Sequence, residues 1–180
     1  MKPRILACLI ALLGPTTVIT PVAKASTIYT DGLAIPSRIQ WNGNYGYCGE
    51  VSFISAGLYY GQYLSQYDAR AIASKNARQS ITSSQLLIGV NDEYAATSLR
   101  LRYEKPKKTI SRSLFLAWVK GKLVSGVPVI IGVFMNQTKF YGTLNLNAGD
   151  TEYDHIVSVT GFESTHTPSV PATYYPDKTE

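Results

Sequence analysis

A single cysteine and its local context carry the clearest chemical signal in this sequence. Cys48 follows a stretch rich in glycine and asparagine, residues 41–47, which is typical of a loop. From Cys48 onward Val51, Ile54 and Leu58 recur at spacings of three and four, which predicts a helix. A thiol in the first turn of a helix meets free backbone N–H groups and the positive end of the helix dipole, and both favour the thiolate. The pattern therefore predicts a nucleophilic cysteine.

A thiolate nucleophile needs a base that can later donate a proton, and histidine suits both tasks. Two histidines follow Cys48 in the sequence, His155 and His166. Residues 154–162 alternate in the manner of a half-buried strand, so His155 opens a rigid element that can hold an imidazole in place. His166 lies in a stretch of loop-forming residues, 164–168, without such support. An isolated histidine is more often structural, but the pairing with a lone cysteine favours His155 as the catalytic partner.

The first 25 residues resemble a secretory signal peptide. Lys2 and Arg4 are followed by an apolar run, 5–13, and residues 23–25 (Ala-Lys-Ala) match a cleavage site with small residues. The apolar run is too short to span a bilayer, which argues against an uncleaved membrane anchor. We therefore expect residues 1–25 to be a signal peptide, residues 26–180 to form a single domain, and the mature protein to be secreted.

Removal of the signal peptide leaves an odd number of cysteines. Cys8 is lost with the signal, so Cys48 stands alone. Secreted proteins use cysteines mostly in pairs, and an odd one indicates a reactive thiol, a bridge between two chains, or a small buried apolar side chain.

The charge of the mature chain excludes few partners but suggests none that are polyanionic. Three of the 17 Lys and Arg residues lie in the signal, so 14 remain against 12 Asp and Glu, a net charge of +2. We expect no nucleic acid as a partner and, because no later stretch is apolar enough to span a bilayer, no membrane. The remaining 155 residues can bury a core without disulfides.

The order of the expected elements predicts an α+β fold. After a short strand at residues 28–29, the helix from Cys48 is followed by helical patterns, and the continuous strands come last. The further expected elements are a helical stretch over 82–99, the start of a strand at 101–103, a helix over 111–124 ended by Gly126, and strands over 127–134 and 154–162.

Three segments, taken in order, resemble the papain-like cysteine peptidase superfamily, most closely its small bacteriocin-processing branch. They are Gly46-Tyr47-Cys48-Gly49, the helix that leads into Gly126-Val127-Pro128-Val129, and His155-Ile156-Val157 in a strand ending at Gly161. The resemblance covers about residues 40–162. It implies a papain-like fold, with an N-terminal helical part that carries Cys48 and a C-terminal antiparallel sheet that carries His155.

The resemblance also implies roles for individual residues. Cys48 would form a thioester with the substrate, and His155 would act as base and acid. The oxyanion would be bound by the Cys48 N–H and by a side-chain amide upstream. Residue type favours Gln40 for this amide, whereas spacing favours Asn42, and both stay candidates. The substrate would be a peptide or protein, and no metal or organic cofactor is needed.

Two departures from the family pattern leave room for an inactive module that binds a peptide or protein partner. Glu50 stands where relatives have a small residue; its carboxylate would either oppose the thiolate or act only as a favourable charge in the first turn. The third catalytic residue should be an Asp or Asn on a later strand, and after His155 only Asp177 qualifies. Asp154 precedes His155 directly and would point to the opposite face of a strand. We therefore expect that the orienting residue is missing or that the C-terminus is truncated.

Overall fold

A computed structural model describes residues 28–134 and 153–169, so the expected signal peptide and Asp177 lie outside the described residues. The α+β class is confirmed. The strands are β1 (Tyr29–Gly32), β2 (Val129–Val133), β3 (His155–Val159) and β4 (Gly161–Ser164). The helices are α1 (Cys48–Tyr59), α2 (Gln66–Ala73), α3 (Asp92–Ser98) and α4 (Arg112–Val124), with a 3₁₀ turn, η1 (Thr82–Ser84).

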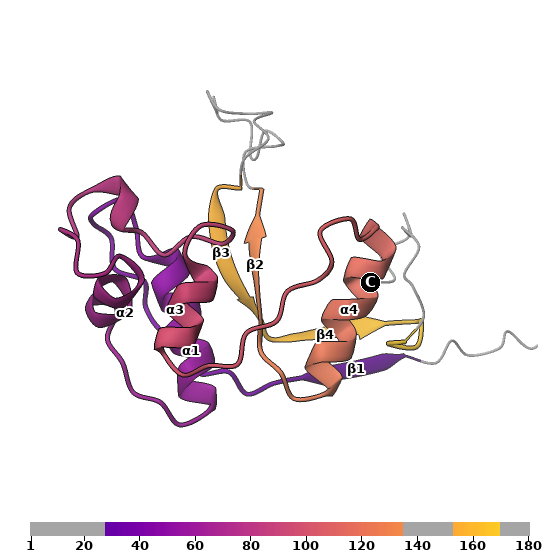
Figure 1. The fold of residues 1–180 in the computed structure, drawn as a ribbon. Coiled ribbons are helices and arrows are strands. Elements are labelled where there is room, and N and C mark those ends of the chain that lie inside the picture. Colours follow the sequence, from indigo (N-terminus) through magenta and orange to yellow (C-terminus); the bar gives the residue numbers. More distant parts are fainter. Residues whose placement is uncertain (1–27, 135–152, 170–180) are drawn as a thin grey trace, which may run out of the picture.

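The strands form two small antiparallel pairs, which are connected where β3 continues into β4. β2 pairs with β3, with Val133 opposite His155, and β1 pairs with β4. In Figure 1, α1, α2 and α3 lie on one side of the β2–β3 pair, while α4 lies over β1 and β4 on the other side. The β2–β3 pair therefore stands between two helical parts.

Each side of the β2–β3 pair has its own hydrophobic core. On the α1 side Phe53 and Leu86 are buried with residues of α2 and α3, and Ile130 packs against them. On the α4 side Leu123 is buried with Val129, and Ile131 packs against that cluster. Neighbouring residues of β2 thus serve opposite cores, as the alternation of side chains along a strand requires.

The expected helix over 111–124 is confirmed with nearly the same limits. Ser111 lies just before α4, and its hydroxyl accepts a hydrogen bond from the Leu114 backbone N–H, which satisfies one of the free donors at the helix start. Gly126 follows the helix with a φ of +73°, a left-handed conformation that glycine adopts without strain.

The expected strand over 154–162 is interrupted at Thr160, where β3 ends and β4 begins. Beyond Thr160 the chain changes its pairing partner from β2 to β1, against which Gly161 packs. A Cβ atom at Gly161 would lie 2.7 Å from the carbonyl oxygen of Asp31, so only glycine allows β4 to approach β1 this closely.

Two further expectations about local structure were wrong, and one helix was missed. The stretch 82–99 holds only η1 and α3, because a turn over 88–91 with Gly89 at a φ of +82° separates them. Residues 101–103 form no strand among the described residues. The missed helix, α2, begins after Ser65, whose hydroxyl accepts from the Asp68 backbone N–H at 3.1 Å.

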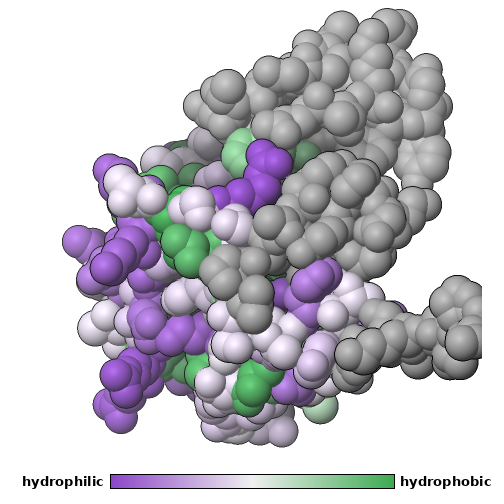
Figure 2. Space-filling view, turned by 90° about the vertical axis from the view of Figure 1, so that its right-hand side faces the viewer, coloured by the Kyte–Doolittle hydropathy of each residue, from purple (hydrophilic) through white to green (hydrophobic). Residues whose placement is uncertain are grey.

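The surface shown in Figure 2 carries hydrophobic residues in small patches separated by hydrophilic ones. Leu114 and Val124 of α4 are each about half-exposed, which is ordinary for isolated apolar residues of a helix at a surface. None of the helices within residues 28–134 and 153–169 has the length and apolar character needed to cross a membrane.

Candidate active site

Cys48 is the first residue of α1, as the sequence predicts. Its side chain is partly exposed, and it forms no disulfide with the described residues. Tyr47 precedes it as the N-cap residue but provides no side-chain hydrogen bond to the helix start. The first backbone N–H groups of α1 therefore lack a side-chain cap, which leaves them available to an anion at this end of the helix.

The start of α1 lies beside the start of β3, where His155 is the first residue. The Ser52 hydroxyl donates to the Ile156 carbonyl at 3.2 Å, and the Ser158 hydroxyl donates to the Ser52 carbonyl at 3.4 Å. A Cβ atom on Gly49 would lie 3.3 Å from Cδ1 of Ile156. The residues that directly follow Cys48 and His155 are therefore in close contact, and the two elements run side by side from that end (Figure 1).

The side chains of β3 alternate between the two faces of the strand. Ile156 and Ser158 contact α1, so His155 and Val157 belong to the other face. Within the described residues no hydrogen bond joins the Cys48 thiol to the His155 imidazole. A Cys48–His155 pair therefore requires the imidazole, at the first position of the strand, to turn around the strand end toward α1.

The structure distinguishes the two candidates for the upstream amide. Gln66 of α2 holds the backbone on both sides of Gln40. The Gln66 side chain accepts from the Trp41 N–H at 3.0 Å and donates to the Ile39 carbonyl at 2.8 Å. A Cβ atom on Gly46 would lie 3.5 Å from Nε2 of Gln40, so this amide lies beside the loop that leads into α1.

Asn42 has no comparable support. Both side chains are exposed and form no hydrogen bond with the part of the chain that the structure describes. The difference is that Gln66 holds the backbone on both sides of Gln40 and that the Gln40 amide lies beside Gly46. Gln40 is therefore better positioned than Asn42 to point an amide toward the start of α1.

The remaining candidates do not gather at the start of α1. Asp177 lies outside the described residues. Asp154 is exposed, and its backbone N–H donates to the Val133 carbonyl at 3.0 Å. His166 follows β4, which runs away from α1 in Figure 1; its ring nitrogen Nδ1 lies 3.1 Å from the Thr165 hydroxyl.

Glu50, which stands two residues after the cysteine, is part of a buried ion pair. Oε1 of Glu50 accepts from Nε of Arg70 at 2.6 Å and from the backbone N–H of Leu86 at 3.0 Å. Both charged side chains are fully buried. The carboxylate is thus neutralised by a cation and occupied by two donors, so its role is structural in this arrangement.

Arg70 also fixes the loop that precedes Cys48. Its terminal nitrogens donate to the carbonyl of Asn44 at 2.7 Å and to the carbonyl of Gly46. The guanidinium carbon lies 3.7 Å from the centre of the Tyr47 ring, a cation–π contact. Because Asn44, Tyr45 and Gly46 all have positive φ, these bonds hold a conformation that the loop would not adopt alone.

Tyr47 anchors the end of the same loop. Its side chain is buried, and its hydroxyl donates to Oε1 of Gln79 at 2.9 Å. Trp41 packs edge-on against the ring, with ring centres 5.5 Å apart. Sequence reasoning missed the supporting residues Gln66, Arg70 and Gln79, which belong to no motif; the one available signal was the Ser65-x-x-Asp68 pattern that marks the start of α2.

No family model, no curated protein and no solved structure matches this chain significantly. Among residues 28–134 and 153–169, no three His, Cys, Asp or Glu side chains gather in an arrangement that could hold a metal ion.

Proposed function

We propose that this protein is a secreted thiol hydrolase of the papain-like type that cleaves peptide or amide bonds. The observation that supports this most is the contact between the starts of α1 and β3, which brings the elements carrying Cys48 and His155 together at one end. The amide of Gln40 lies beside the loop that leads into the same end of α1.

The reaction follows from the chemistry of these groups. The Cys48 thiolate attacks the substrate carbonyl carbon, and the resulting oxyanion accepts hydrogen bonds from the Cys48 N–H and the Gln40 amide. Protonated His155 donates its proton to the leaving amine, which departs as the C–N bond breaks and leaves a thioester. Water, deprotonated by His155, then attacks the thioester, and the Cys48 thiolate leaves as the acid product is released.

A second candidate function is a papain-like module that binds a peptide without cleaving it. The observation that favours it is the absence of a hydrogen bond between Cys48 and His155 in the described part of the chain, together with the alternation that assigns His155 to the face opposite α1.

Alkylation and hydrolysis together decide between these functions. An ordinary thiol, with a pKa of about 8.5, is almost wholly protonated at about pH 6 and reacts slowly with iodoacetamide there. We expect the mature wild-type protein to be alkylated rapidly at Cys48 at this pH, and fluorescein-labelled casein to be cleaved. Both effects should weaken in His155→Ala and persist in His166→Ala, the matched control, while Cys48→Ala should abolish both.

The hydrolase proposal is wrong if His155→Ala retains full activity, or if the wild-type protein neither reacts at pH 6 nor cleaves casein. Export is tested separately. The protein recovered from the medium of a secreting host should begin at Ser26, and recovery of the uncleaved chain from the cells alone would contradict the expected signal peptide.

A further inference from the structure

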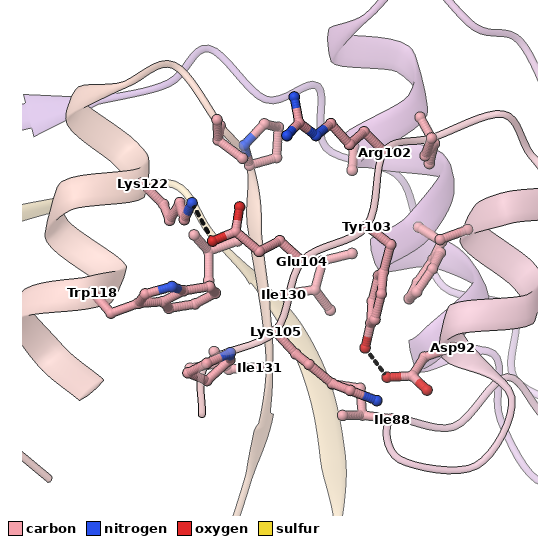
Figure 3. Close-up of a pocket in the computed structure, with 18 of the residues that line it drawn as sticks. Ile88, Asp92, Arg102, Tyr103, Glu104, Lys105, Trp118, Lys122, Ile130 and Ile131 are labelled. Atoms are coloured by element: carbon pink, nitrogen blue, oxygen red, sulfur yellow. Dashed lines mark hydrogen bonds and ion pairs between the residues drawn. The ribbon is translucent and has the colours of Figure 1, made fainter. Parts of the chain in front are cut away.

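A cavity of about 540 Å³ lies between α1 and α3 on one side and α4 on the other (Figure 3). All residues from Val127 to Gly132 line it, and so do all residues from Leu101 to Pro106. Because successive residues of a strand point to opposite faces, a cavity lined by every one of them runs along the strand edge. It follows the edge of β2 that does not pair with β3. Cys48 and His155 are not among its lining residues.

The body of the cavity is apolar. Phe53 of α1, Trp118 of α4 and Ile130 of β2 contribute to its walls, and Phe115 and Leu101 extend them. The volume falls in the range of about 300–1,000 Å³ that is usual for small-molecule sites, which are mostly apolar with a few polar groups.

The carboxylates that line the cavity already have partners. Asp92 accepts a hydrogen bond from the Tyr103 hydroxyl, and Glu104 forms an ion pair with Lys122 at 2.7 Å (Figure 3). Lys122 and, more weakly, Arg102 lower the pKa of the Glu104 carboxyl and so favour its charged form. Neither acid is therefore left to attract a ligand cation.

Among the charged residues that line the cavity, Arg102 is the one whose charge is least balanced by a partner within the described part of the protein. Its side chain is exposed and forms no hydrogen bond or close ion pair with the described residues. Lys105 lies near the other end of the drawn cavity, where it pairs with Glu93 at 3.2 Å in a contact that is largely exposed to solvent and hence weak (Figure 3). The charge at the cavity that remains open to a ligand is consequently positive, and Arg102 carries it.

We propose that this cavity binds a small amphipathic molecule with an apolar chain and one carboxylate. The chain lies along the edge of β2 against Phe53 and Trp118, and the carboxylate faces Arg102. This site is separate from the proposed Cys48–His155 centre, so its ligand need not be a substrate of the hydrolase.

Dodecanoate, below its micellar concentration, is a suitable probe. Titration of the ¹⁵N-labelled mature protein should shift the amide resonances of residues 101–106 and 127–132. Dodecan-1-ol and dodecylammonium have the same chain length without the negative charge, and we expect both to bind more weakly than dodecanoate. Equal affinity for the three compounds overturns the assignment of an anionic ligand, and the absence of shifts in both segments overturns the site.

Variants sharpen the test. Arg102→Gln should weaken dodecanoate binding about threefold, as expected for an exposed ion pair, and Arg102→Lys should restore most of it. Arg78→Gln is the matched control, because Arg78 is exposed and is not among the residues lining the cavity; it should change nothing. Cys48→Ala should also bind dodecanoate normally, which separates this proposal from the hydrolase.

A variant with a larger side chain in the cavity should bind the ligand more weakly. Ala56→Phe places a ring in the cavity from α1 and should lower dodecanoate affinity about tenfold or more, by occupying volume that several methylene groups would otherwise fill. The thermal unfolding of this variant shows whether it folds. If it does not fold, the resonance mapping on the wild-type protein still decides. Unchanged affinity in a folded Ala56→Phe variant contradicts the proposal.

Discussion

Arg70 donates from Nε to Oε1 of Glu50 over 2.6 Å, and both side chains are buried. The pair joins α2 to the first turn of α1, the turn that carries Cys48. Arg70 also donates to the backbone carbonyls of Asn44 and Gly46. One side chain thus provides hydrogen-bond donors both to the Glu50 carboxylate and to the loop that precedes Cys48. Arg70 of α2 therefore fixes the position of the first turn of α1.

Removal of the Arg70 side chain should strongly destabilise the fold. Arg70→Met leaves Glu50 buried without its cation, and we expect the free energy of unfolding to fall by about 3–5 kcal/mol, measured by urea denaturation. The double variant Glu50→Gln/Arg70→Met should be less destabilised than Arg70→Met alone, since no buried charge is then left unpaired.

The exposed pair between Lys105 and Glu93 is the control for this measurement. Lys105→Met removes a pair whose side chains are more than half exposed, and it should cost less than about 1 kcal/mol. If Arg70→Met lowers the free energy of unfolding no more than Lys105→Met, the buried Glu50–Arg70 pair does not hold α1 and α2 together.

The choice between the two upstream amides can be tested by activity. Both side chains are exposed, but Gln66 holds the backbone on both sides of Gln40, and the Gln40 amide lies beside Gly46 at the loop that leads into α1. Gln40→Ala should therefore lower kcat on labelled casein about a hundredfold or more, the usual cost of removing one oxyanion donor. Asn42→Ala should leave kcat unchanged, and the reverse result would assign the donor to Asn42.

Gly49 is a second point at which the start of α1 is tightly constrained. A Cβ atom there would lie 1.9 Å from the carbonyl oxygen of Leu86, which is backbone and cannot turn away. Gly49→Ala should destabilise the fold by about 2 kcal/mol, as overpacking does, even though alanine favours the helix.

Gly121 provides the matched control, because it also lies inside a helix but has open space around its Cα. A Cβ atom at Gly121 meets nothing within 4 Å. Gly121→Ala should raise the free energy of unfolding by about 0.5–1 kcal/mol through the lower backbone entropy of the unfolded chain. Equal effects of the two substitutions in urea denaturation would show that close packing at Gly49 is not limiting.

The sequence allowed the local structure around the candidate site to be predicted, because the signals there are local. The loop before Cys48, the period of α1, the serine cap of α4 and the alternation from His155 are all readable within a few residues. These signals correctly predict that Cys48 begins a helix and that His155 begins a strand. They say nothing about which face of β3 lies against α1, since that depends on contacts between residues about a hundred positions apart.

The residues that support the site could not be predicted for the same reason. Gln66 and Arg70 act on residues 20 to 27 positions upstream, and an amide or a guanidinium on a short helix gives no sign of such a partner. The end of β3 at Thr160 was missed because the chain there changes its pairing partner from β2 to β1, a strand about 130 positions earlier in the sequence. Long-range packing decides both features.

Tyr103 connects the cavity to the pH dependence of stability. Its hydroxyl donates to the buried carboxylate of Asp92. Burial, followed by this hydrogen bond, raises the pKa of the Tyr103 phenol above its ordinary value of 10.0. As the pH rises past about 10, the unfolded chain loses the phenol proton while the folded chain keeps it, so the unfolded state becomes relatively more favourable.

We therefore expect the stability that Tyr103 contributes to be complete below about pH 10 and to decrease above it. Tyr103→Phe should lower the free energy of unfolding at neutral pH, by about 1–3 kcal/mol for the unsatisfied Asp92, and should also flatten its decline between about pH 9 and 11. Tyr63→Phe is the control, because Tyr63 is 82% exposed and forms no such bond with the described residues. Urea denaturation across this pH range measures both variants, and a decline in Tyr103→Phe as steep as in the wild type would assign the alkaline sensitivity to other groups.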